Sequence, residues 1–188
     1  MEEKATKSHR YPSSPRHLLR IDIIRIALVA GGLAAATAIA QSSPPASPRA
    51  REVEALVNNA AVLIDANGKA AFSRFRAKGS EWFHGDTYLF AYDLKGNVLL
   101  NPAFPAREGT NVSGQKDATG KLFHDAIIST AASKGSGWVD YMFPKPGQTQ
   151  PSQKWAFVKA VKIDGVPGLV ASGLVASGGR RLASGLAA

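Results

Sequence analysis

The chain has 188 residues, a net charge of +9 and no cysteine. Its length suits one domain with additional segments, and its 45% apolar and 20% charged residues are typical of a folded protein. The lack of cysteine excludes a disulfide scaffold, a thiolate nucleophile and cysteine-ligated zinc or iron–sulfur sites. The positive charge could suit nucleic-acid binding, so its distribution along the chain has to be considered.

Residues 1–40 have the pattern of a secretory signal peptide. Six basic and three acidic side chains lie within residues 1–25, and an uncharged apolar run follows over 26–40 and ends in Ala38-Ile39-Ala40. This run is shorter than the roughly 20 residues that span a bilayer. We therefore predict a leader that is cleaved before Gln41, and a periplasmic or secreted protein. The alternative is an uncleaved helix over 21–40 that anchors the chain in the membrane.

Most of the positive charge lies outside the predicted folded region. The leader contributes +3, and Arg49, Arg180 and Arg181 contribute three more charges. Residues 51–176 therefore carry a net charge of only +3. A mildly basic, exported domain is not expected to bind nucleic acid, although its charge slightly favours anionic ligands.

The rest of the chain shows a clear order of elements. Residues 41–50 read as a Pro/Ser-rich linker, and residues 177–188 as a disordered tail. Between them, apolar spacing predicts a long helix from Arg51, a short helix over 69–75 and a third helix over about 122–134. Strands are predicted over 87–93, 98–101, 138–143, 155–163 and 166–174, with Pro167 favouring an edge position or a bulge.

This order predicts an α+β fold. The strands follow one another through tight turns, such as Asp164-Gly165, and so form an antiparallel sheet of about five strands. The long N-terminal helix and the later helix cover this sheet. Along the strand 87–93, Tyr88, Phe90 and Tyr92 should share one face, with Leu89 and Ala91 on the other.

Four stretches of the sequence resemble the single Cache domain, a PAS-like extracytoplasmic sensor module of bacterial chemoreceptors and kinases that also occurs as a free-standing exported protein. They are the helix from Val53 to Phe72, the string Gly85–Asp93, the string Gly137–Tyr141 with Pro144, and Lys154 with the strand after it. Together they cover most of residues 51–176. Similar domains often have His before the proline that follows the first hairpin, whereas this chain has Asn101-Pro102.

The resemblance implies a ligand pocket between the sheet and its covering helices and loops. Tyrosines suit such a pocket because each offers an apolar ring and a hydroxyl, and a lysine can pair with a carboxylate. The alternatives are that the aromatic residues are core packing, that Trp82 pins a loop, and that the lysine is a solvated strand end. The candidate ligand-binding residues are Trp82, Tyr88, Phe90, Tyr92, Tyr141, Phe143 and Lys154.

No pattern in the sequence indicates catalysis, a metal or a cofactor. After the leader, His84 and His124 are the only histidines, and neither has ligand-like spacing to other residues. We therefore predict a non-enzymatic sensor that binds a small organic ligand, for example a short carboxylate, and signals through a membrane-bound receptor or kinase. The alternative is a structural module that docks on a receptor, kinase or transporter without a ligand of its own. The oligomeric state stays open.

Overall fold

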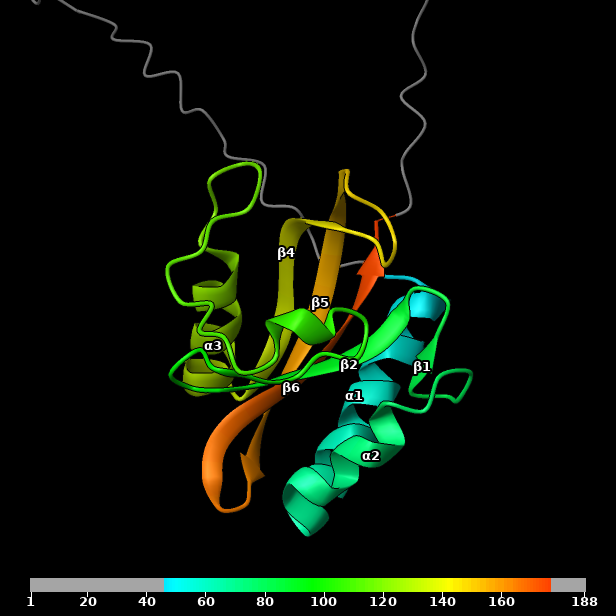
Figure 1. Cartoon of the computed structure of the whole chain (residues 1–188), viewed down its shortest axis with the longest axis vertical. Helices are drawn as coiled ribbons and strands as arrows, with labels where there is room; N and C mark the ends of the chain where they lie inside the picture. Colours follow the sequence, from blue (N-terminus) through cyan, green and yellow to red (C-terminus); the bar gives the residue numbers. More distant parts are fainter. Residues whose placement is uncertain (1–45, 177–188) are drawn as a thin grey trace, which may run out of the picture. The chain divides into compact units, whose positions relative to one another are not determined.

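A computed structural model describes residues 46–176 (Figure 1). The predicted leader, residues 41–45 of the predicted linker and the predicted tail lie outside the described residues. Within 46–176, no helix is both long and apolar enough to cross a membrane. The elements are α1 (Pro48–Asn67), the 3-10 helix η1 (Gly68–Ala71), α2 (Phe72–Phe75), β1 (Phe83–His84), β2 (Thr87–Asp93), β3 (Val98–Leu100), the 3-10 helix η2 (Pro105–Arg107), α3 (Phe123–Lys134), β4 (Ser136–Pro144), β5 (Pro151–Ile163) and β6 (Val166–Val175).

Helix α1 begins earlier than its apolar spacing predicts. The Ser47 hydroxyl caps the helix by accepting a hydrogen bond from the Ala50 backbone N–H at 3.1 Å, and Pro48 occupies the first turn, where its missing N–H costs nothing. Residues 48–50, which the sequence analysis assigned to the linker, therefore belong to the helix. The short helix predicted over 69–75 is confirmed as η1 followed by α2.

The strands form one antiparallel sheet in the order β1-β2-β6-β5-β4, with β3 paired to β2. The predicted α+β class, with its long N-terminal helix and antiparallel sheet, is thus confirmed. Strand β6 lies in the middle of the sheet, but Pro167 itself has the predicted edge position, because only β5 lies beside it. The proline is tolerated there because the pairing of β6 with β2 begins only at Gly168, so the missing N–H of Pro167 interrupts no ladder on that side.

The sheet is covered on both faces, with α1 and α2 on one side and α3 on the other (Figure 1). Leu89 and Ala91 face α1 and join its core cluster, whereas Tyr88, Phe90 and Tyr92 belong to the cluster that contains α3. The predicted alternation along β2 is therefore confirmed. Because β2, β5 and β6 contribute residues to both clusters, side chains on the α3 face can form a site while those on the α1 face hold the domain together.

Helix α1 is fixed to the sheet along its length. The Trp138 Nε1–H donates to Glu54 Oε1 at 2.7 Å, and the Lys159 ammonium donates to Asn58 Oδ1 at 2.8 Å. At the C-terminal end of the helix, Gly68 has a φ of +56° and lies against the β5–β6 turn. A Cβ at Gly68 would come within 1.7 Å of Asp164 Oδ1, the same oxygen that accepts a hydrogen bond from the Lys69 N–H.

We predict that Gly68→Ala destabilises the domain more than Gly79→Ala does. Both glycines have positive φ, but a Cβ at Gly79 would meet nothing within 4 Å. Gly79→Ala should therefore show only the backbone cost, about 1 kcal/mol, whereas Gly68→Ala should cost about 1–3 kcal/mol more because the α1–hairpin contact has to open. Urea unfolding of both variants measures the difference, and equal losses would show that this contact is unimportant.

Candidate ligand-binding site

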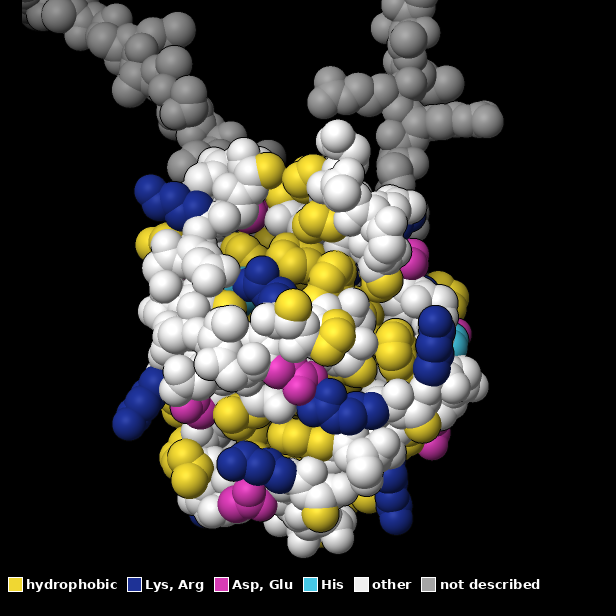
Figure 2. Space-filling model, in the orientation of Figure 1, with side chains coloured by type: hydrophobic (Ala, Val, Ile, Leu, Met, Phe, Trp, Pro, Cys, Tyr) yellow, Lys and Arg dark blue, Asp and Glu magenta, His cyan; other side chains and the backbone are white. Residues whose placement is uncertain are grey.

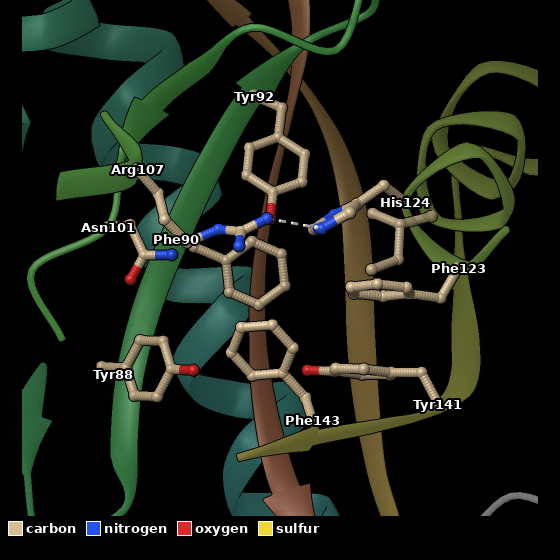
Figure 3. Close-up of a pocket in the computed structure, with 10 residues that line it drawn as sticks. Tyr88, Phe90, Tyr92, Asn101, Arg107, Phe123, His124, Tyr141 and Phe143 are labelled. Atoms are coloured by element: carbon tan, nitrogen blue, oxygen red, sulfur yellow. Dashed lines mark hydrogen bonds between the residues drawn. The ribbon is translucent and has the colours of Figure 1, made fainter. Parts of the chain in front are cut away.

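A small cavity lies on the α3 face of the sheet, between β2, β4, α3 and the loop that follows β3 (Figure 3). Its volume is about 10 Å³, close to the least that a single water molecule needs. On the same face of the molecule, apolar side chains gather over the middle of the sheet with basic side chains among them (Figure 2). The residues that line the cavity are Tyr88, Phe90, Tyr92, Asn101, Arg107, Phe123, His124, Ile127, Tyr141 and Phe143.

Five of the seven predicted site residues meet in this cavity. Tyr88, Phe90 and Tyr92 enter it from β2, and Tyr141 and Phe143 enter it from β4 (Figure 3). They also pack as aromatic residues do in a core, for example where the Tyr141 ring stacks on Phe123 with centroids 4.9 Å apart and planes 7° from parallel. These aromatic residues therefore line the cavity and are also part of the packed core.

The three tyrosines keep their protons. Burial in apolar surroundings raises the pKa of Tyr88, Tyr92 and Tyr141 well above the usual value of a phenol. For Tyr88 and Tyr92, the positive charge of Arg107 opposes this rise without cancelling it. Each hydroxyl is therefore a neutral group that can donate one hydrogen bond and accept others.

Lys154, the sixth predicted residue, lies next to the cavity and is almost completely buried. Its exposed fraction is 1%, so the alternative of a solvated strand end is wrong. Strand β5 already begins at Pro151, and Lys154 pairs with Tyr141 on one side and Val175 on the other. Gly173 leaves room beside Lys154 for the Tyr141 hydroxyl, since a Cβ at that position would lie 3.3 Å from this oxygen and 3.2 Å from the Trp155 carbonyl oxygen.

The surroundings of the Lys154 ammonium are aromatic. Nζ donates to the Tyr88 hydroxyl at 3.3 Å and lies 5.1 Å from the centroid of the Tyr88 ring and 5.9 Å from that of Phe143. Burial lowers the pKa of Lys154 to about 8. The negative charge of Asp86 opposes this shift, and the positive charge of Lys145 adds to it. At pH 7 the side chain is therefore mostly charged. Within residues 46–176 it makes no ion pair with a carboxylate.

The loop between β3 and α3 supplies residues that sequence reasoning missed. Arg107 lies at the end of η2, and its Nη2 donates to His124 Nε2 at 2.9 Å, the bond drawn in Figure 3. Burial and the nearby charge of Arg107 lower the pKa of His124 to about 3, so this imidazole is neutral. A basic residue in an irregular loop carries no periodic signal, and only Asn101, at the position that differs from similar domains, pointed to this part of the chain.

Asn101 and Glu108 shape this loop. The Asn101 Oδ1 accepts a hydrogen bond from the Phe104 N–H at 3.1 Å, and the Asn101 N–H donates to Glu108 Oε1 at 2.7 Å. Glu108 is in turn bound by both terminal nitrogens of Arg76, at 2.7 and 2.8 Å. This bidentate pair fixes η2 against the end of α2 and so sets the position of Arg107.

Trp82, the seventh predicted residue, lies elsewhere. It is buried in the core cluster on the α1 side of the sheet, where its ring meets Phe75 with centroids 5.0 Å apart. Trp82 therefore does not line this cavity, and the alternative, that it pins the segment between the helices and the sheet, fits its position. Among the described residues, no group of three His, Asp or Glu side chains is placed to hold a metal ion.

Residues 64–166 match the Cache domain family, and the chain belongs to this family. It is similar to a periplasmic sensor domain of a chemotaxis protein, with 32% identity, a TM-score of 0.54, and coverage of 68% of this chain and 92% of the other. This family consists of sensor domains and not of enzymes, in agreement with the prediction made from the sequence.

Two solved structures share the fold at 22% identity. One is a Cache chemosensory domain studied for its recognition of carboxylic acids, with a TM-score of 0.59 and coverage of 68% of this chain and 93% of that one. The other is a methyl-accepting chemotaxis protein from Vibrio parahaemolyticus, with a TM-score of 0.56 and coverage of 68% and 88%. These two likenesses concern the fold alone.

A curated relative is the methyl-accepting chemotaxis protein McpP of Pseudomonas putida. It is 27% identical to this chain over 77 residues, which cover 41% of this chain and 14% of the relative. The chain therefore matches only a small part of that receptor's length.

We predict that His124 makes the stability of the domain fall as the pH is lowered. In the unfolded chain His124 takes up a proton near its ordinary pKa of 6.5, whereas in the folded domain it stays neutral down to about pH 3. Below pH 6.5 the unfolded state therefore binds more protons, and the free energy of unfolding falls by up to about 1.4 kcal/mol per pH unit from this group.

Urea unfolding between pH 4.5 and 6.5 should show this slope in the wild type. Carboxylates with lowered pKa values, such as Asp117 and Asp125, add a slope of the same sign mainly at lower pH, and they are common to all variants. His124→Asn should lose the slope, while His84→Asn, which changes an exposed histidine, should keep it. The same slope in His124→Asn and the wild type would contradict the neutral, buried imidazole.

Proposed function

We propose that this chain is a periplasmic sensor domain that binds a small organic anion and signals its presence to a membrane-bound receptor or kinase. The observation that carries this proposal is the Lys154 ammonium, which is buried to 1% exposure beside the aromatic cavity. No described carboxylate pairs with it. A buried charge without a partner is costly, so its retention is explained if a ligand supplies the opposite charge.

A short carboxylate suits this environment. The ammonium can donate hydrogen bonds to carboxylate oxygens, and the Tyr88 hydroxyl beside it can donate another. The rings of Phe90 and Phe143 supply apolar surface for a short carbon chain. One related domain supports the same ligand class, since it was solved for its recognition of carboxylic acids. The match to a methyl-accepting chemotaxis protein supports the sensory role.

We further propose that the chain is exported in a free-standing form. The predicted leader over 1–40 would be removed, and residues 46–176 would be the sensor, with the remaining residues as linker and tail. Intact-mass spectrometry of the protein recovered from the periplasm of a Gram-negative host tests this proposal. We expect a chain that begins at Gln41, whereas a full-length chain recovered only from the membrane fraction would support the anchored alternative.

We predict that Lys154→Met abolishes ligand binding without destabilising the domain. Removing the buried ammonium removes a desolvation cost, and Met fills much of the same space. The melting temperature of the ligand-free variant should therefore equal or exceed that of the wild type. Lys162→Met is the matched control, because Lys162 is an exposed lysine of the same strand.

Thermal unfolding against a set of short organic acids measures this effect. A ligand at a hundred times its Kd stabilises the native state by about 2.7 kcal/mol, which shifts the midpoint by roughly 10 °C for a domain of this size. The shift should appear in the wild type and in Lys162→Met and vanish in Lys154→Met. If no acid shifts the unfolding midpoint of wild-type protein that has been shown to be ligand-free, the alternative of a docking module without its own ligand gains support.

A further inference from the structure

A second cation, the guanidinium of Arg107, lines the same cavity as the tyrosines. Its Nη2 donates to Gln115 Oε1 and to His124 Nε2, both at 2.9 Å. Its Nε is buried and has no hydrogen-bond partner. Because a buried donor left unpaired costs free energy, this N–H marks a place where an acceptor is missing.

The carboxylates near Arg107 are engaged elsewhere. Glu108, its neighbour in sequence, is held by Arg76 through two hydrogen bonds. Asp125, the neighbour of His124, accepts hydrogen bonds from the Ser113 hydroxyl at 2.8 Å and the Gly114 N–H at 2.9 Å. Over residues 46–176, Arg107 therefore makes no ion pair, although it is charged at any physiological pH.

His124 offers a second unpaired donor. Its Nε2 accepts the hydrogen bond from Arg107, so the proton of the neutral ring is on Nδ1. This Nδ1 is buried and, like Arg107 Nε, has no hydrogen-bond partner. The groups left unsatisfied at this end of the cavity are therefore N–H donors, and they suit an anionic acceptor.

The two cations approach one aromatic ring. Arg107 Cζ lies 5.5 Å and Lys154 Nζ 5.9 Å from the centroid of Phe143, so the two charges are at most about 11 Å apart. Two charge-assisted hydrogen bonds of about 2.8 Å take up about half of the largest possible span and leave at most about 5 Å between the ligand's outer oxygens, which limits the ligand to a short diacid.

We propose that Arg107, with His124, forms a second anion-binding arm, and that the ligand is a short dicarboxylate with one carboxylate at Lys154 and the other at Arg107. This inference rests on the proposed function and narrows it from carboxylates in general to dianions. Lys154 is fixed in the ladder of β4, β5 and β6, whereas Arg107 belongs to the loop after β3. The proposal therefore requires that space for the ligand opens at the Arg107 end, by a shift of η2 about its anchor at Arg76 and Glu108.

Isothermal titration calorimetry at pH 7 and constant ionic strength tests the proposal on the protein expressed from the full chain and recovered from the periplasm of the Gram-negative host. The probes are matched pairs that differ in one carboxylate, malonate against propionate and succinate against butyrate. We expect the wild type to bind at least one diacid ten times or more tightly than its monoacid. Arg107→Met should weaken diacid binding at least tenfold and change monoacid binding less than threefold.

Two further variants serve as controls. Arg74→Met removes an exposed arginine of α2 and should bind both classes as the wild type does. Arg107→Lys keeps the charge and should keep the preference for diacids, which separates lost charge from a damaged fold. Circular dichroism of Arg107→Met should match that of the wild type.

Two results would overturn the inference, and they differ from failure of the proposed function. If monoacids bind the wild type as tightly as diacids, or if Arg107→Met weakens both classes equally, Arg107 is not an anion-binding arm. The sensor function would then stand as long as Lys154→Met abolishes monoacid binding. If neither class binds the ligand-free wild type, the proposed function fails and the inference fails with it.

Discussion

The site depends on one constraint, a lysine ammonium held among aromatic rings on a covered face of the sheet. Lys154 is held away from solvent, because strand β5 is paired on both sides and Tyr88 of β2 and Phe143 of β4 lie beside its ammonium. Desolvation makes this charge costly, and the neutral Tyr88 hydroxyl offsets only part of the cost. An anion that enters the cavity would replace the favourable interaction with water that the ammonium loses on burial. Binding of such an anion would therefore stabilise the charged form of Lys154.

The rest of the fold allows such a site to exist in a small domain. Helix α1 buries one face of the central strands with alanine and branched apolar residues, and it is fixed at its far end by the contact of Gly68 with the β5–β6 turn. The opposite face is closed by α3 and by the loop after β3. This loop is anchored through Glu108 and Arg76 and carries Arg107 over the cavity. The two faces of the sheet therefore have separate roles, with support on the α1 side and the candidate site on the α3 side.

Much of the fold and about half of the site could be predicted from the sequence. Period-two alternation placed Tyr88, Phe90 and Tyr92 on one face because strand geometry fixes that pattern locally. No such pattern applies to Trp82, because it precedes β1 in a turn region where no periodicity decides which side of the sheet a ring meets. Arg107 and His124 come together only through the path of a loop, and their 2.9 Å contact has no signature in the sequence.

The most direct test of the account is the pKa of Lys154, followed through its ¹³Cε chemical shift by NMR, with Lys154→Met for assignment. In the ligand-free protein we expect a pKa of about 8, below the ordinary 10.5 of lysine, because burial disfavours the charged form. Saturation with malonate should raise this pKa, since a nearby anion favours the ammonium. A pKa near 10.5 in the free protein, or one that malonate leaves unchanged, would contradict the claim that Lys154 is a buried cation which binds an anionic ligand.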